Sequence, residues 1–428
     1  MSFAVEVKLI TLDPAHFHAA LVQKEMLPGI ARRSYIYAPL GPDLLEHLKR
    51  IQGFNTRADH PTDWEVDVHC TNDPVRRMCT ERPGNVVVIA GRSRNKMERI
   101  RAALDAGLNV LADKPWIIRA ADIPALESAL ELADRSGLVA YDIMTERFEP
   151  STIIQKYLVN DPAVFGTPVA GTEADPGVVI ESVHHLLKTV AGVPNLRPAF
   201  FFDVAEQGTG LADVGTHLID LVPWTLFPNQ AIRTSQDLRI GASRRWATVM
   251  TLEQFQRVTA LPAFPPELAG NVKQGRLEYD CNGEVHYQIR GLHVRLAALW
   301  NYESPTGVDL HHALYRGTKA SVEVRQGEKE KYVPEVYVAP NGPQNRAAVT
   351  QALDAHIRRL QTEYGGVAYE SSGDELHVVI PDRYRVGHEA HFAQVLGQFL
   401  GYLGAPKSMP AWERPNMIAK YTVSTTGT

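Results

Sequence analysis

Short apolar runs alternate with helix-like stretches along the first third of the chain. Six such runs are rich in valine, isoleucine and other strand-forming residues: VEVKLITL, SYIYAP, WEVDVHC, NVVVIAG, LNVLADKP and LVAYDIM. Each of the first five is followed by a segment with helical spacing. Apolar runs that are buried on both faces are typical of a parallel sheet under helices. The pattern therefore predicts a doubly wound α/β domain over residues 1–145.

The pattern changes after Met144. One helix pattern, STIIQKYLV, precedes longer stretches in which apolar and polar residues alternate, such as EVHYQIRG, HVRLAALWNYE and ASVEVRQ. Half-buried antiparallel strands show this alternation. Two later helix patterns, NRAAVTQALDAHIRRLQ and VGHEAHFAQVLGQFLGYL, complete the chain. We expect an α+β domain with a large open, mainly antiparallel sheet over residues 146–428.

The alternating strands also suggest how subunits associate. Many apolar side chains fall on the same face as Tyr287, and few helix patterns remain to cover them. Such a face on a monomer would be an aggregation liability. We therefore expect a homo-oligomer, a dimer or a tetramer, that forms through this sheet.

Composition narrows the class of protein. The chain has 428 residues, of which 44% are hydrophobic and 22% charged, and its net charge is -5. Nothing in this balance favours nucleic-acid or membrane binding. Its three cysteines form no disulfide framework. The start of the chain lacks the features of a signal peptide, and no apolar run approaches the ~20 residues of a membrane helix. We expect a soluble, cytoplasmic protein.

Two segments carry candidate chemistry. In NVLADKPW, Lys114 follows the fifth predicted strand, and ligands of open α/β sheets bind outside the carboxyl ends of strands. In GTGLADVGTHLIDLVPW, Asp213 and His217 are four residues apart and would share one face of a helix. A neighbouring carboxylate orients an imidazole and suits it to act as a general base. The alternative interpretations are a surface lysine and a solvated ion pair.

Together these segments resemble the Gfo/Idh/MocA oxidoreductase family, the glucose–fructose oxidoreductase and inositol dehydrogenase type. The family's EKP segment corresponds to Asp113-Lys114-Pro115, and its DxGxH helix to the stretch from Asp213 to His217. The run VVIAGRSRNKMERIRAALDAGLNVLADKP resembles the family's fourth strand, helix and fifth strand. The segments SVHHLLKTVAG, RPAFFFDV and RYRVGHEAHF resemble a branch with a distinct C-terminal α/β region, described as putative oxidoreductases.

The resemblance implies a Rossmann-type domain, a nicotinamide cofactor and a sugar, glycoside or polyol substrate, with the 3-hydroxyl of a glucoside as the leading candidate. It implies that His217 accepts the hydroxyl proton, that Asp213 orients His217, and that Lys114 stabilises negative charge on the same oxygen. It also implies cofactor contacts from the residues after the fourth strand and substrate contacts from the second domain. The former are Gly91, Arg92 and Ser93, and the latter are Arg147, His185 and His217.

The segment LITLDPAHFHAA contains no glycine, although a dinucleotide-binding loop ordinarily has three. Asp13, Ala15 and His18 take their places. Pro14 suits the first helical position and Asp13 the N-cap, so we predict that a helix begins here. We expect its N-terminus and His16 to contact the pyrophosphate, with Lys114 also part of the cofactor site.

The second strand ends in YIYAPLGPD, which has neither an acid nor an arginine at the usual ribose position. Asp43 favours NAD, and NADP stays open. Three histidine pairs, His184/His185, His311/His312 and His388/His391, could line the site, and among them we expect a substrate contact from His185. None has the HExxH spacing, so we expect no metal.

Two other functions remain open at this stage. A glycosidase that uses bound NAD for transient oxidation would need the same base and cofactor. A non-enzymatic dinucleotide-binding regulator is favoured by the missing glycines and disfavoured by Lys114, Asp213 and His217.

Overall fold

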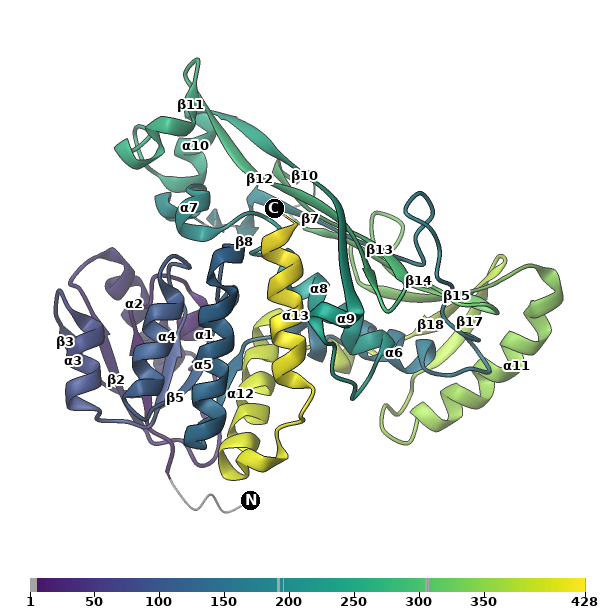
Figure 1. The fold of residues 1–428 in the computed structure, drawn as a ribbon, viewed down its shortest axis with the longest axis horizontal. Coiled ribbons are helices and arrows are strands. Elements are labelled where there is room, and N and C mark those ends of the chain that lie inside the picture. The colour runs from purple at the N-terminus through teal and green to yellow at the C-terminus, as the bar shows by residue number, and fades with distance from the viewer. Residues whose placement is uncertain (1–5, 191–192, 195, 305, 307, 428) are drawn as a thin grey trace. The chain divides into compact units, whose positions relative to one another are not determined.

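The computed structural model describes residues 6–427, apart from 191–192, 195, 305 and 307. The chain divides into two compact units (Figure 1). Unit 1 contains residues 1–145 and 387–414, and unit 2 contains residues 146–386 and 415–428. Within the described residues, no helix combines the length and the apolar character needed to cross a membrane.

Unit 1 is built on a six-stranded, fully parallel sheet in the order β3-β2-β1-β4-β5-β6. Its strands are β1 (Leu9–Leu12), β2 (Arg33–Ala38), β3 (Glu65–Cys70), β4 (Val86–Ile89), β5 (Asn109–Ala112) and β6 (Ala140–Asp142). The two central strands, β1 and β4, are buried throughout, whereas the edge strand β3 is largely exposed. This is the predicted doubly wound fold, and the strand order reverses between β1 and β4, where ligands of such sheets bind.

Helices connect these strands. They are α1 (His18–Leu21), α2 (Pro42–Thr56), α3 (Pro74–Glu81), α4 (Lys96–Asp105) and α5 (Ile123–Ser136). Proline at the first helical position begins α2 and α3, and the Asp73 side chain caps α3 by accepting a hydrogen bond from the backbone of Arg76. The starts of α2 and α3 therefore follow from local sequence signals.

Unit 1 also contains α12 (His388–Gly404), which is distant in sequence from the rest of the unit. We had placed this segment with the second domain. It packs on α1, and the ring of Phe392 lies 4.7 Å from that of His18. Helical periodicity shows which face of a segment is buried, but it does not show against which sheet that face packs.

Unit 2 is built on a ten-stranded mixed sheet. Its main path is β10-β12-β13-β7-β14-β15-β16-β18-β17, with β11 paired to β12. All neighbours are antiparallel except β13 and β7. The strands are β7 (Val178–Leu187), β10 (Leu238–Thr251), β11 (Val272–Lys273), β12 (Arg276–Ile289), β13 (Leu292–Glu303), β14 (Leu310–Arg316), β15 (Ala320–Gln326), β16 (Glu335–Pro340), β17 (Ala368–Ser372) and β18 (Glu375–Val379). A separate small pair is formed by β8 (Thr189–Val190) and β9 (Val193–Pro194).

The helices of unit 2 cover one face of its sheet. They are α6 (Pro150–Val159), α7 (Val204–Gln207), α8 (Gly215–Leu226), α9 (Thr234–Asp237), α10 (Leu252–Thr259), α11 (Pro343–Leu360) and α13 (Glu413–Thr426), the last of which begins just before the unit boundary. Residues of α6, α8, α11 and α13 pack with Val285, Tyr287 and Ile289 in one core cluster. The apolar face of Tyr287 is therefore covered by the chain's own helices, and our reason for expecting an exposed apolar face was wrong.

The opposite face of the sheet carries charged side chains in ion pairs, most of which join different strands. Glu284 binds both Arg244 and Arg295, and Arg325 binds both Glu323 and Glu375. Opposite charges on neighbouring strands stabilise a sheet modestly and keep its exposed face polar. Association through this sheet remains a prediction, and it would have to use polar contacts.

Candidate functional site

The loop after β1 does not form the helix start that we predicted. Helix α1 begins at His18, has four residues and lacks a side-chain cap, whereas Asp13 has a φ of 48°. The Ala15 amide donates to the Asp13 carbonyl, and the His16 amide donates to Ala90 at the end of β4. These local bonds turn the chain away from helical geometry. The predicted N-cap at Asp13 is therefore wrong, and so short a helix offers little dipole to a phosphate.

Asp13 instead forms an ion pair across the sheet. Its carboxylate lies 3.1 Å from the guanidinium of Arg99 on α4. Gly91, in the loop after β4, permits this approach of the two loops, because a Cβ at that position would lie 2.4 Å from the Asp13 carbonyl oxygen. In this protein the glycine that lets the loops after β1 and β4 approach each other therefore lies after β4 and not after β1.

His16, His18 and Asp113 meet at the carboxyl ends of β1 and β5. The Nδ1 atom of His18 is 2.8 Å from Oδ2 of Asp113, and Nδ1 of His16 is 3.4 Å from the same oxygen. Burial lowers the pKa of His18 to about 3, against the opposing effect of Asp113. His18 is therefore a neutral imidazole near pH 7, and its Nδ1–H donates to the Asp113 carboxylate.

The same three side chains are the set that best resembles a metal site within the described residues, since their ligand atoms all lie within 4.8 Å of one another. Two lysines are close to this set. The Lys96 ammonium donates to the Asp113 carbonyl at 3.1 Å, and the Lys114 charge acts on His18. Neighbouring cations disfavour a metal ion at this set.

Lys114 and Asp113 directly follow β5, and both are buried. The remaining predicted cofactor residues follow β4. Arg92 donates to Asp43, in the first turn of α2, at 3.0 Å, and the buried Ser93 hydroxyl has no hydrogen-bond partner within the described residues. A buried hydroxyl without a partner is costly, which is consistent with a ligand that bonds to it here.

Asp213 and His217 belong to unit 2. His217 lies in the first turn of α8, and Asp213 lies in the turn before that helix rather than on it. Both side chains are buried. Gly210 allows this turn to contact the sheet, because a Cβ there would lie 2.0 Å from the Cys281 carbonyl oxygen of β12. The backbone of this turn and that of β12 therefore approach each other closely at Gly210.

Arg147, a predicted substrate residue, is engaged in a buried ion pair. Its guanidinium donates to both carboxylate oxygens of Asp220 at 2.6 and 2.8 Å, and Lys420 donates to the same carboxylate at 2.9 Å. Burial raises the pKa of Asp220, but the two cations lower it well below its usual range. Fully enclosed bidentate pairs of this kind hold elements of a fold together.

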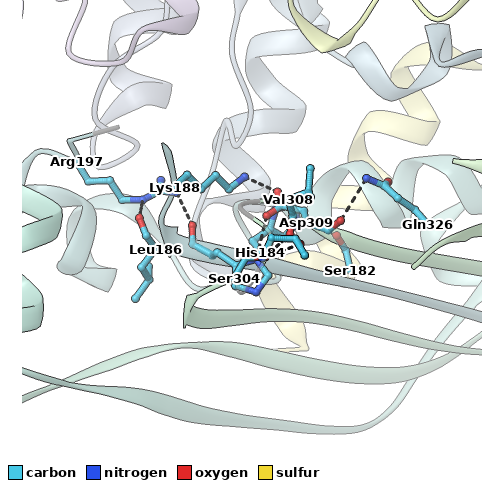
Figure 2. A network of polar contacts seen from close by, with 11 residues as sticks. Ser182, His184, Leu186, Lys188, Arg197, Ser304, Val308, Asp309 and Gln326 are labelled. Atoms are coloured by element: carbon cyan, nitrogen blue, oxygen red, sulfur yellow. Dashed lines mark hydrogen bonds and ion pairs between the residues drawn. The ribbon is translucent and has the colours of Figure 1, made fainter. Parts of the chain in front are cut away.

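His185, the other predicted substrate residue, belongs to a polar cluster that sequence reasoning missed. The Asp309 carboxylate accepts hydrogen bonds from His184 and Lys188 (Figure 2). It also lies 3.4 Å from Nδ1 of His185. We call His184, His185, Lys188 and Asp309 the Asp309 cluster. The histidine pair was visible in the sequence, but no local signal connects it to an aspartate more than 120 residues later.

Comparison with known proteins agrees with this architecture. Residues 154–428 match the family described as "Putative oxidoreductase C terminal domain". A crystal structure from Parabacteroides merdae ATCC 43184, described as a "putative oxidoreductase", is 44% identical over 100% of this chain and 98% of that one, with a TM-score of 0.96. No curated protein matches the sequence.

More distant structures share the fold. A levoglucosan dehydrogenase in complex with NADH and L-sorbose has 13% identity and a TM-score of 0.61 over 98% of this chain and 97% of that one. KijD10, a 3-ketoreductase from Actinomadura kijaniata in complex with NADP and TDP-benzene, has 12% identity and a TM-score of 0.56 over 98% and 95%. The family match covers well over half of the chain, so the protein belongs to the oxidoreductase family that this C-terminal domain defines.

Proposed function

We propose that the protein transfers hydride between a secondary hydroxyl of a sugar, glycoside or polyol and a nicotinamide cofactor. One observation carries the proposal. Lys114 follows β5 of a doubly wound sheet in unit 1, and Asp213 and His217 stand at the start of α8 in unit 2 of an oxidoreductase-family chain. Two structures of the same fold, described as a dehydrogenase and a ketoreductase, contain NADH and NADP.

The loops after β1 and β4 fit a dinucleotide. They come together where the strand order reverses, with Gly91 allowing close contact and the Ser93 hydroxyl buried without a partner in the described part of the chain. In our proposal the backbone from Asp13 to His16 and the segment from Gly91 to Ser93 hold the phosphates. The carboxylate of Asp43, which favours a free ribose hydroxyl, supports NAD over NADP.

The chemistry assigns one role to each polar side chain. When bound, the nicotinamide ring supplies the hydride acceptor. Oxidation of a secondary alcohol also releases the hydroxyl proton, which His217 takes as general base while Asp213 orients the imidazole. Lys114 donates a hydrogen bond to the same oxygen and stabilises the negative charge that develops there. Positioning and charge stabilisation are thus the contributions of this chain.

The test begins with the purified protein. Mass spectrometry should detect a nicotinamide dinucleotide carried through purification or bound on addition, and titration with NAD and NADP should show the tighter binding for NAD. A panel of sugars, methyl glycosides and polyols should then produce reduced nicotinamide. A Lys114→Met variant should lose this activity. Its unfolding temperature should be unchanged, which would show that the loss does not come from misfolding.

Three results would contradict the proposal. Failure to bind either dinucleotide would remove the cofactor assignment. Release of free sugar from an aryl glycoside without net formation of reduced cofactor would indicate a glycosidase. Dinucleotide binding without oxidation of any compound in the panel would favour a regulatory protein.

A further inference from the structure

We propose that the Asp309 cluster is a binding subsite for adjacent hydroxyl groups of a neutral, unphosphorylated sugar. The inference rests on the proposed function and deepens it by naming the class of substrate. All four residues of the cluster belong to unit 2. The sequence suggested only His185 as a substrate residue, and the structure adds His184, Lys188 and Asp309.

The cluster is a connected chain of polar groups. Asp309, directly before β14, accepts a hydrogen bond from Nδ1 of His184 at 2.9 Å and another from the Lys188 ammonium. Nε2 of His184 lies 2.7 Å from the hydroxyl of Ser182, two residues earlier on β7 (Figure 2). Carboxylate oxygens, imidazole nitrogens, an ammonium and a hydroxyl are therefore within hydrogen-bonding distance of one another.

Strand register places Ser182 and His184 on one face of the sheet. Ser182 of β7 is the direct partner of His311 on β14, and His184 is the partner of Trp300 on β13. Residues that oppose each other on paired strands point to the same face. The ring of Trp300 indeed lies 5.0 Å from that of His184. The same face bears Ile180 of β7, which belongs to the core that α8 covers.

The cluster is accessible to a ligand. The side chains of His184, Lys188 and Asp309 are 19%, 24% and 21% exposed. The buried Asp220 site, whose carboxylate is only 2% exposed, shows what a closed structural cluster looks like in this protein. A partly open carboxylate with N–H donors beside it matches a sugar diol, because each hydroxyl both donates and accepts.

Arg197 connects the cluster electrostatically to the proposed catalytic pair. Arg197 donates to the backbone carbonyls of His185 and Leu186 at the end of β7. Burial lowers the pKa of this guanidinium, while the charges of Asp213 and Asp309 both raise it. One guanidinium therefore stands within the electrostatic reach of both carboxylates.

Charge decides the class of ligand. The ammonium of Lys188 is matched by the carboxylate of Asp309. Burial lowers the pKa of His185, and it lowers that of His311 to about 4, so both imidazoles are neutral near pH 7. The Arg197 guanidinium is committed to backbone carbonyls and stacks on Phe201 and Trp300. No unmatched positive charge remains in the cluster for a phosphate or a uronate, and a neutral polyhydroxyl compound fits best.

The experiment compares three variants with the unsubstituted protein. Asp309→Asn and Lys188→Met should each raise KM for the sugar substrate about tenfold to a hundredfold, the equivalent of a lost charge-assisted hydrogen bond. The value of kcat and the Kd for NAD should stay within about threefold of the original, since these residues do not touch the reacting atoms. Neutral methyl glycosides should be better substrates than the matching uronates or sugar phosphates.

The matched control is His312→Gln. His312 lies on β14, close in sequence to Asp309, but its imidazole contacts Glu323 on β15 instead of Asp309. If KM rises as much in His312→Gln as in Asp309→Asn, the cluster is structural. The same holds if Asp309→Asn changes only the unfolding temperature and leaves KM unchanged. A preference for uronates or phosphates would overturn the neutral class.

Failure of the inference is distinguishable from failure of the proposed function. The latter fails if no sugar is oxidised by the unsubstituted protein. In that case, saturation-transfer NMR with methyl glycosides still tests the cluster. Binding that Asp309→Asn weakens would support the subsite, and equal signals, or none, would overturn it.

Discussion

Nδ1 of His18 donates to Oδ2 of Asp113 at 2.8 Å and so joins the loop after β1 to the end of β5. His18 stands where a dinucleotide-binding loop ordinarily has its third glycine, which packs helix on strand. In this protein the large imidazole is accommodated because it finds a buried carboxylate and because Phe392 of α12 packs beside it. Side-chain contacts therefore hold this loop in place, whereas in the usual loop glycines allow the backbone to pack closely.

The first prediction concerns His16. If its imidazole contacts the dinucleotide phosphates, His16→Ala should weaken NAD binding by about 1 kcal/mol for a neutral hydrogen bond and by roughly 1.5–3 kcal/mol for a charged one. Calorimetric titration of cofactor-free protein measures this directly. Unchanged affinity would show that the phosphates are held without His16.

The second prediction concerns Asp13. Its φ of 48° lies in a region that glycine adopts freely, so Asp13→Gly should relieve backbone strain while losing the contact with Arg99. The two effects oppose each other, and we expect an unfolding temperature close to the original. Removal of a negative charge near the phosphates should leave NAD affinity equal or higher in the same titration. Weaker binding would mean that the Asp13–Arg99 pair shapes the cofactor loop.

The third prediction concerns His217. His217→Ala should reduce turnover by about a hundredfold or more, which is the usual scale for a positioned general base. The Kd for NAD should barely change. Steady-state kinetics on the best substrate, together with calorimetry, separates the two effects, and near-original turnover would exclude His217 as the base.

The fourth prediction concerns Arg147, whose side chain is enclosed with Asp220 and Lys420. Removing one cation from a buried carboxylate is strongly destabilising, so Arg147→Met should lower the free energy of unfolding by about 3 kcal/mol. Denaturant unfolding tests this. A stable variant with a raised KM would instead support the substrate contact that the sequence suggested.

The fifth prediction concerns acid stability. Burial lowers the pKa of His47, on α2, to about 4, and no described residue bonds to either ring nitrogen. As pH falls below about 6.5 the unfolded chain takes up a proton that the folded chain does not, so stability declines by up to about 1.4 kcal/mol per pH unit for each such histidine. His47→Leu should remove one such proton and flatten the stability profile between about pH 7 and about pH 5. The exposed residue His60 provides the control, and His60→Asn should leave the slope unchanged.

Several features were predictable because their causes are local. Runs of valine and isoleucine beside helical spacing defined all six strands of the parallel sheet, and the position of Lys114 after β5 followed from the same pattern. Alternation of apolar and polar residues defined β12, β13 and β15 in the same way. The association of DKP with DVGTH predicted an oxidoreductase, and the family match supports that class.

Other features depended on contacts between distant segments. Local signals at Asp13 and Pro14 favoured a helix start, but the His16 amide bonds to Ala90, just after the neighbouring strand β4, and the helix begins only at His18. The pattern of α12 showed an apolar face without showing that it packs on α1. Asp309 lies 121 to 125 residues from the groups that it binds, so only the pairing of β7 with β14 brings them together. The sequence by itself determined which elements form, because periodicity and turn residues act over a few positions. The tertiary structure decided which side chains meet, because strand pairing and burial act between segments far apart in the chain.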